Sequence, residues 1–164
     1  MYYLEKQKKV TRQMEIKGSR KISAPQQQVF QALLNPEVLK NSIPGCEKAE
    51  LVDFPDGQQL KLKVSPPVPG FKGPYHIFMR TREIVAPSHL ILIAEPKSSV
   101  GEVTATCTID LTTEGDVTVL NYNADASLSG KVSHIPDMAL KPVIKTSLDQ
   151  FFKNFEKQIA MITA

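Results

Sequence analysis

The C-terminal stretch, residues 137–162 (DMALKPVIKTSLDQFFKNFEKQIAMI), most limits how this chain can fold. With roughly 100° of rotation per residue in an α-helix, its large apolar side chains share one face and its charged side chains fall elsewhere. That face comprises Leu140, Ile144, Leu148, Phe151, Phe155, Ile159 and Ile162. A helix of this length with a continuous apolar stripe must lie on an apolar surface, which the rest of the chain has to supply.

Pro142 lies inside this predicted helix. A proline in a helix interior removes one backbone hydrogen bond and costs about 3 kcal/mol or more. The sequence therefore predicts that the helix either kinks at Pro142 or starts near it.

The upstream chain shows the period-two alternation of β-strands. The clearest case is residues 102–113, in which Val103, Ala105, Cys107, Ile109 and Leu111 alternate with polar side chains. Turn sequences such as Pro55-Asp56-Gly57 separate the segments. The strands are predicted at residues 14–22, 46–53, 60–65, 75–82, 90–94, 102–113 and 120–128.

Two short helices are expected between the first two strands. Ser23 can cap the first, Pro25 suits its first turn, and its apolar stripe is Val29, Phe30, Leu33 and Leu34. Asn35-Pro36 ends this helix, because the residue before a proline is pushed out of the α region. Pro36 then opens a second helix up to Ser42, with Val38 and Leu39 turned inward.

This order of elements predicts an α+β fold, a curved antiparallel sheet of about seven strands closed by the long C-terminal helix. A length of 164 residues suits one domain, which we place at residues 14–164. Residues 1–13 form a basic extension, and residues 1–21 carry a net charge of +5 against +3 for the whole chain. Such an arm could touch nucleic acid or an anionic membrane, or be a solvated tail.

The longest apolar run, Leu90–Ala94, is far too short for a membrane span, and no secretory signal is evident. Cys46 and Cys107 lie far apart in sequence, so reduced thiols in a cytoplasmic protein are expected. Cys46 follows a Pro-Gly turn, which favours a packing role over a reactive thiol.

Patterns that signal catalysis are not found in the sequence. His76, His89 and His134 belong to no nucleophile motif and form no metal-ligand cluster. No phosphate-binding glycine loop occurs, and aromatic residues are too few for a nucleic-acid surface. We therefore expect no catalytic residue, no metal, no cofactor and no nucleic-acid partner.

The interior between sheet and helix is the candidate site. It could be a filled core or an open cavity. Small residues on neighbouring strands, Ala105, Cys107, Ala124 and Ala126, favour an open cavity. The hydroxyl groups of Tyr75 and Tyr122 would need partners there. The expected lining is Leu62, Val64, Tyr75, Ile77, Met79, Val103, Ala105, Cys107, Tyr122, Ala124, Ala126, Leu140, Ile144, Leu148 and Phe151.

Three segments resemble the carbon monoxide dehydrogenase CoxG family, within the START/SRPBCC helix-grip superfamily. They are MEIKGSRKISAPQQQVFQALLNPEVLKNSIPGCE at 14–47, FKGPY at 71–75 and DQFFKNF at 149–155. The run PxxxVFxxLxxPxxL…IPGC, from Pro25 to Cys46, is the most specific part.

The resemblance implies a non-catalytic accessory protein with a cavity for a lipid- or quinone-like ligand. It also implies a role in maturation or membrane recruitment of a molybdenum hydroxylase such as carbon monoxide dehydrogenase, with peripheral contact at the inner face of the membrane. Some members carry a membrane-attachment tail after the final helix, whereas this chain ends at Ala164.

Two other functions remain open from the sequence. One is an enzyme of the aromatase or cyclase type, for which Glu83 on the fourth strand is the candidate ionisable residue. The other is a protein–protein adaptor without a ligand, using the basic arm or the proline-rich loop at 66–69.

Overall fold

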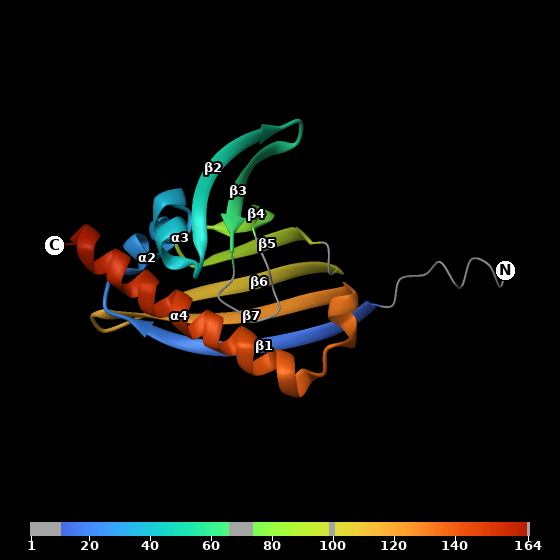
Figure 1. The fold of residues 1–164 in the computed structure, drawn as a ribbon. Helices are drawn as coiled ribbons and strands as arrows, with labels where there is room; N and C mark the ends of the chain where they lie inside the picture. The colour runs from blue at the N-terminus through green and yellow to red at the C-terminus, as the bar shows by residue number, and fades with distance from the viewer. Residues whose placement is uncertain (1–10, 66–73, 99–100, 164) are drawn as a thin grey trace, which may run out of the picture.

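The computed structural model describes residues 11–65, 74–98 and 101–163 as an antiparallel sheet crossed by one long helix (Figure 1). Its elements are β1 Thr11–Ile22, α2 Gln26–Leu33, α3 Pro36–Ser42, β2 Cys46–Phe54, β3 Gly57–Val64, β4 Tyr75–Val85, β5 His89–Ser98, β6 Gly101–Glu114, β7 Val117–Gly130, the 3₁₀ helix η1 Lys131–His134 and α4 Asp137–Thr163. The predicted order is confirmed, with β1 starting at Thr11. The arm at 1–10 and the prolines at 66–69 lie outside the described residues.

The sheet has seven strands in the order β1-β7-β6-β5-β4-β3-β2, and every neighbouring pair is antiparallel. Strands β2 to β7 form a meander in which each strand pairs with the next one along the chain. Only β1 departs from that order, because it pairs with β7 from the other end of the chain. The predicted curved antiparallel sheet is confirmed (Figure 1).

The sheet has an apolar inner face and a polar outer face, as the alternation predicts. On β3, Leu60, Leu62 and Val64 are 7%, 1% and 4% exposed, whereas Lys61 and Lys63 between them lie on the other face. The helix α4 crosses the inner face diagonally (Figure 1). The helices α2 and α3 lie beside its C-terminal part, and α3 and α4 are in contact.

The start of α2 differs from the prediction. Pro25 occupies the N-cap position in an extended conformation and makes no side-chain cap, so the expected cap at Ser23 is wrong. Ser23 lies two residues too early for its hydroxyl to reach the first turn. The segment before α2 is held by Thr118, whose buried hydroxyl donates to the Ala24 carbonyl at 2.6 Å. Leu34, expected on the inward stripe, is 38% exposed.

The start of α3 follows standard capping rules. Pro36 is at the first helical position, as expected. The Asn35 side-chain oxygen accepts hydrogen bonds from the backbone N–H groups of Glu37 and Val38 at 2.9 and 3.4 Å. These bonds satisfy two of the donors that a helix start leaves open, which fixes the corner between α2 and α3.

The long helix α4 runs through Pro142 without ending there. The N–H that proline lacks would bond the carbonyl of Met138, and the Met138 residue is 90% exposed. Because water can reach this first turn, the loss is smaller than in a buried helix interior. At the other end the buried stripe stops at Ile159, and Ile162 is 58% exposed where the last turn extends beyond the sheet (Figure 1).

Candidate functional site

An apolar cavity of about 370 Å³ lies between the inner face of the sheet and α4, with α2 and α3 closing one side. Strands β3 to β7 form its floor. Its lining residues are Leu33, Leu39, Ile43, Pro44, Leu62, Ile77, Met79, Leu92, Ala94, Ala105, Cys107, Ile109, Tyr122, Val143, Ile144, Ser147, Leu148, Phe151 and Phe152. None of these residues carries a charged side chain.

The cavity exists because the side chains on its floor are too small to reach the helix above them. Ala94 and Ala105 are opposed on β5 and β6, and Leu92 is opposed to Cys107. Above them, Ile144, Leu148 and Phe151 on α4 are only half-buried although they face the interior. Close-packed interiors leave few voids larger than a water molecule, so a space of this size is a feature of the site and not a packing defect.

Many of the residues expected from the sequence line this cavity. They are Leu62, Ile77, Met79, Ala105, Cys107, Tyr122, Ile144, Leu148 and Phe151. They come from β3, β4, β6, β7 and α4, so the fold brings together residues that are far apart in sequence. Their contact with a ligand stays a prediction.

The other expected lining residues lie elsewhere: Val64, Tyr75, Val103, Ala124, Ala126 and Leu140. Val64 packs in a cluster with Leu39, Leu60 and Leu62, and Tyr75 is half-buried opposite it at the start of β4. Leu140 packs with Met14 and Leu128, and Val103 and Ala126 lie against that cluster. Ala124 lies between β1 and β6 on β7. The first turns of α4 thus press on β1 and β7, which shifts the cavity toward β3–β6.

Sequence reasoning missed the wall that comes from the short helices. Leu33, Leu39, Ile43 and Pro44 line the cavity from α2, α3 and the turn after them. The sequence predicts that Leu33 and Leu39 point inward, but nothing in it shows what they face. Ala94 was missed because it ends an apolar run without alternation, so its face could not be assigned.

The cavity's polar groups are uncharged. Burial raises the pKa of the Cys107 thiol to about 12, so the group stays protonated at neutral pH and is a poor nucleophile. Burial also raises the pKa of the Tyr122 phenol, with a further increase from Asp149. Ser147 on α4 adds a hydroxyl. The arrangement suits an apolar molecule with at most a neutral polar group.

Tyr122 fixes the floor beside β1. Its ring stacks on Phe152 with centroids 5.2 Å apart, and the Arg20 guanidinium lies 5.4 Å from the Phe152 ring centroid. Arg20 also pairs with Asp149 at 3.5 Å. Gly18 is opposed to Tyr122 across β1 and β7, and a Cβ at Gly18 would overlap the Tyr122 ring and hydroxyl. The Tyr122 side chain therefore occupies a space that is open to it because residue 18 is glycine.

The ionisable residues considered for chemistry lie away from the cavity. Glu83 is exposed at a bulge in β4 with φ of 48°, so the aromatase-type hypothesis loses its candidate residue. His76 is exposed on the outer face, as expected. His89 begins β5, where its Nδ1 lies 2.6 Å from Asp110 Oδ1, and His134 is in η1. In the described parts of the chain, no three His, Cys, Asp or Glu residues gather as metal ligands.

Within residues 11–65, 74–98 and 101–163, no helix has the length and apolar character needed to span a bilayer.

The sequence matches the model of one protein family, described as the CoxG subunit of carbon monoxide dehydrogenase, over residues 18–160. No curated protein sequence gives a significant match.

Solved structures with the same fold include a conserved protein from Geobacillus kaustophilus. It is 29% identical with a TM-score of 0.82, over 90% of this chain and 96% of that one. A START superfamily protein from Mycobacterium smegmatis is 13% identical with a TM-score of 0.69, over 90% and 98% of the two chains. A protein from Rhizobium leguminosarum is 18% identical with a TM-score of 0.67, over 91% and 98%. The predicted helix-grip fold of the START superfamily is confirmed.

Proposed function

The chain belongs to the carbon monoxide dehydrogenase CoxG family, and we propose on that basis that it is a non-catalytic accessory protein that binds an apolar ligand. The observation that carries this proposal is the cavity of about 370 Å³ without a charged lining residue. Its volume lies within the range of roughly 300–1,000 Å³ of small-molecule sites.

The driving force for binding is desolvation. An apolar molecule that leaves water for this cavity gains about 25 cal/mol per Å² of apolar surface removed from water. The protein's own half-buried side chains, such as Leu148 and Phe151, lose water at the same time. A lipid- or quinone-like molecule fits this chemistry, because the uncharged groups of Tyr122 and Ser147 offer hydrogen bonds without favouring an ion.

Filling the cavity tests the proposal. Ala105→Trp places a large side chain in the middle of the floor, while Ala139→Trp makes the same change at an exposed position on α4. We expect wild type and Ala139→Trp to bind the neutral fluorescent probe N-phenyl-1-naphthylamine equally, and Ala105→Trp to bind it at least tenfold more weakly. Equal affinity in Ala105→Trp, with its fold intact by circular dichroism, would show that the probe binds elsewhere and would overturn the proposal.

The natural ligand can be sought directly. Native mass spectrometry of the purified protein should show added mass that organic extraction removes, and the extract should identify a lipid or quinone. The same treatment of Ala105→Trp should yield no such mass. Material that is retained equally by both proteins would not be a cavity ligand.

We further propose that the partner is a carbon monoxide dehydrogenase-type molybdenum hydroxylase in the cytoplasm, recruited to or matured at the inner face of the membrane. The support is the family to which the chain belongs. Deleting the gene should reduce either the activity of the dehydrogenase or its share in the membrane fraction. If both stay unchanged, the proposed dehydrogenase partner is wrong, even if the protein binds an apolar ligand.

Membrane contact can be separated from partner contact with liposomes. Deletion of residues 1–10 removes the basic segment ahead of β1 while it leaves Arg12, which pairs with Asp137, in place. We expect the full chain to sediment with anionic vesicles more than the deletion variant does, and less so at high salt. Equal sedimentation would remove the arm from the proposal.

A further inference from the structure

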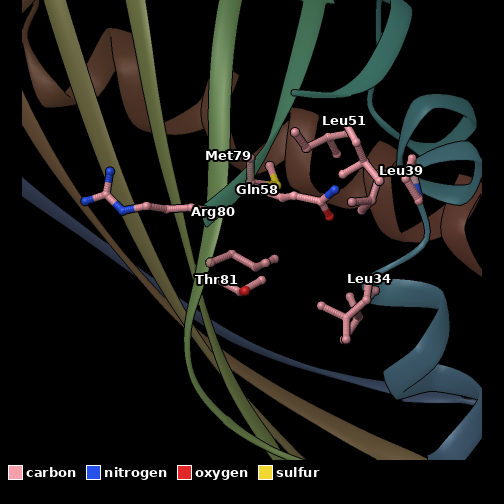
Figure 2. Close-up of a pocket in the computed structure, with 11 residues that line it drawn as sticks. Leu34, Leu39, Leu51, Gln58, Met79, Arg80 and Thr81 are labelled. Carbon is pink, nitrogen blue, oxygen red and sulfur yellow. The ribbon is translucent and has the colours of Figure 1, made fainter. Parts of the chain in front are cut away.

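A second hollow lies next to the cavity, between the end of α2 and the strands β2–β4 (Figure 2). We call it the side groove, and its apolar lining includes Leu34, Leu39, Leu51, Leu60 and Met79. Its volume is about 200 Å³. Leu33, Leu39, Met79 and Leu92 line both the side groove and the cavity, so the two spaces are neighbours that share these side chains.

The register of the sheet connects the two spaces by one row of opposed residues. Leu51 is opposed to Leu60, Leu60 to Met79, Met79 to Ala94, and Ala94 to Ala105. These five residues form one row across the inner face, from the cavity floor on β6 to the side groove on β2. Because neighbouring strands lie about 4.8 Å apart, the four steps of this row span roughly 19 Å.

The side chains change along this row from small to large, and the last of them, Leu51, is exposed. The alanines leave open space, Met79 is half-buried between the two spaces, and Leu60 is 7% exposed. At the far end, Leu51 is 56% exposed and Leu34, across the side groove, is 38% exposed. Methionine is unbranched with three rotatable bonds, so Met79 can move aside with little strain.

Arg80 lines the side groove and the Asp53 carboxylate bonds to a residue that lines it, so the charged groups there have polar partners. Arg80 points away from it (Figure 2) and pairs with Glu95 at 2.6 Å. Gln58 extends into it (Figure 2), with its amide donating to Asp53 at 3.1 Å, and Thr81 lies on the opposite side from Leu39 and Leu51. No cation among the described residues is available there to pair with a buried anion, so the side groove suits apolar chain segments.

We propose that the side groove is the distal part of the ligand site, and that the ligand is an unbranched apolar chain lying across the strands from Ala105 to Leu51. The chain displaces Met79 and ends at the exposed leucines. This proposal rests on the proposed function, because it needs a ligand in the cavity, and it narrows the ligand class from any apolar molecule to one that extends roughly 19 Å.

Blocking the side groove tests this inference. Gln58→Trp fills it from β3 at an exposed position, and Gln59→Trp is the matched control on the opposite face of the same strand. The probes are cis-parinaric acid methyl ester, which has an 18-carbon chain, and the compact N-phenyl-1-naphthylamine. We expect Gln58→Trp to weaken binding of the long probe at least tenfold and to leave the compact probe unchanged. Gln59→Trp should match wild type for both.

Each other outcome is informative. If Gln58→Trp binds the long probe as wild type does, the side groove is not part of the site and this inference fails while the proposed function stands. If wild type binds neither probe, the proposed function itself fails. Thr81→Trp, which fills the side groove from β4, provides a second variant, and an unchanged affinity for the long probe there would also overturn the inference.

Discussion

The two halves of α4 face different surroundings. In the C-terminal half, Phe155 and Ile159 are 0% and 3% exposed and pack on α2 and the sheet. In the N-terminal half, Ile144 and Leu148 are half-buried and line the cavity. The same helix therefore seals a core at one end and forms the wall of an open space at the other.

The difference comes from the surface opposite the helix and not from the helix itself. The closed end faces other residues, Val29 and Phe30 on α2 and Leu120 on β7, which do not line the cavity. The open end faces Ala94 and Ala105. An apolar stripe thus shows only that this face of the helix lies on the rest of the protein. The size of the opposing side chains decides whether a packed core or a cavity forms between them.

Polar bonds hold the closed end in place. The Asn154 side chain donates to the Ser42 carbonyl at 3.1 Å, and Asn41 donates to Gln158 at 3.1 Å. Both bonds join α3 to the C-terminal half of α4. The closed half of α4 is therefore attached to α3 by side-chain hydrogen bonds as well as by apolar packing.

The largest expected effect is a difference in stability between alanine variants of two stacked phenylalanines. Phe151 and Phe155 lie with ring centroids 5.6 Å apart, but Phe155 is in the closed half and Phe151 lines the cavity. We expect Phe155→Ala to lower the free energy of unfolding by about 3–5 kcal/mol, because it leaves a void in a packed core. Phe151→Ala should cost less, about 1–2 kcal/mol, because this half-buried ring borders a space that already exists.

Urea denaturation measures both changes. The midpoint should fall much further for Phe155→Ala, with similar slopes for both variants. Equal losses would mean that the two halves of α4 are packed alike, which would contradict the comparison.

A second prediction concerns the floor next to the closed half. Gly18→Ala should lower the free energy of unfolding by about 1–3 kcal/mol, since the added Cβ overlaps the Tyr122 ring, which stacks on Phe152 and cannot move freely. The neighbouring Ser19→Ala, at an exposed position, should change stability by no more than about 0.5 kcal/mol.

A double variant identifies the cause. The Tyr122 hydroxyl is the atom nearest to the added Cβ, so Tyr122→Phe should recover part of the loss in Gly18→Ala. If Tyr122→Phe and Gly18→Ala simply add, the overlap with the hydroxyl is not the source of the instability, and the ring carbons that phenylalanine keeps are.

The third prediction uses pH to test whether the Cys107 thiol, on the cavity floor under the open half of α4, is buried. The Cys107 pKa is about 12 in the folded protein and 9.0 in an exposed thiol. Because folding favours the protonated thiol, its contribution to stability is complete below pH 9 and is lost as pH rises from 9 to 12. Above pH 9 the wild type should lose about 1.4 kcal/mol per pH unit more than Cys107→Ala does.

Unfolding of both proteins at pH 8, 9 and 10 gives this difference. The other titrating groups, including Cys46, are present in both and cancel. Parallel pH profiles would show that water reaches the Cys107 thiol freely.

The sheet was predictable from the sequence because its signal is local. Alternation with a period of two assigns Leu60, Leu62 and Val64 to one face without knowledge of their neighbours. The order of strands β2 to β7 followed from the short connections between them, whereas the pairing of β1 with β7 joins the two ends of the chain and did not. Helix starts were less predictable. Asn35 caps α3, whereas Ser23 does not cap α2, because a cap forms only where the backbone angles place the side chain over the first turn, and the residue type alone does not fix those angles.

The candidate site was predicted in part because its walls depend on tertiary packing. The expected lining used the sheet and α4, and Ala105 and Leu148 do line the cavity. Leu39 was missed because the position of α3 over the strands is set by contacts distant in sequence. Ala126 was assigned to the cavity and packs beside Leu140 instead, because the tilt of α4 across the sheet cannot be read from its stripe.

The smallest expected effect concerns the ion pair at the boundary between the two halves. Arg20 and Asp149 are 3.5 Å apart, with side chains 27% and 48% exposed. Asp149→Asn should lower stability by no more than about 1 kcal/mol, and the difference should shrink at high salt. The more exposed pair of Lys21 and Glu114, also 3.5 Å apart, is the control, and Glu114→Gln should have a smaller effect.

Arg20 has a second contact that Asp149 lacks. Its guanidinium lies over the Phe152 ring, so Arg20→Ala should cost more than Asp149→Asn, by about 0.5–1 kcal/mol, and this excess should persist at high salt. Urea denaturation of the two variants at low and high salt measures the excess. If salt abolishes it, Arg20 acts only through its charge, and the closed half of α4 is held on this side by burial of its aromatic rings alone.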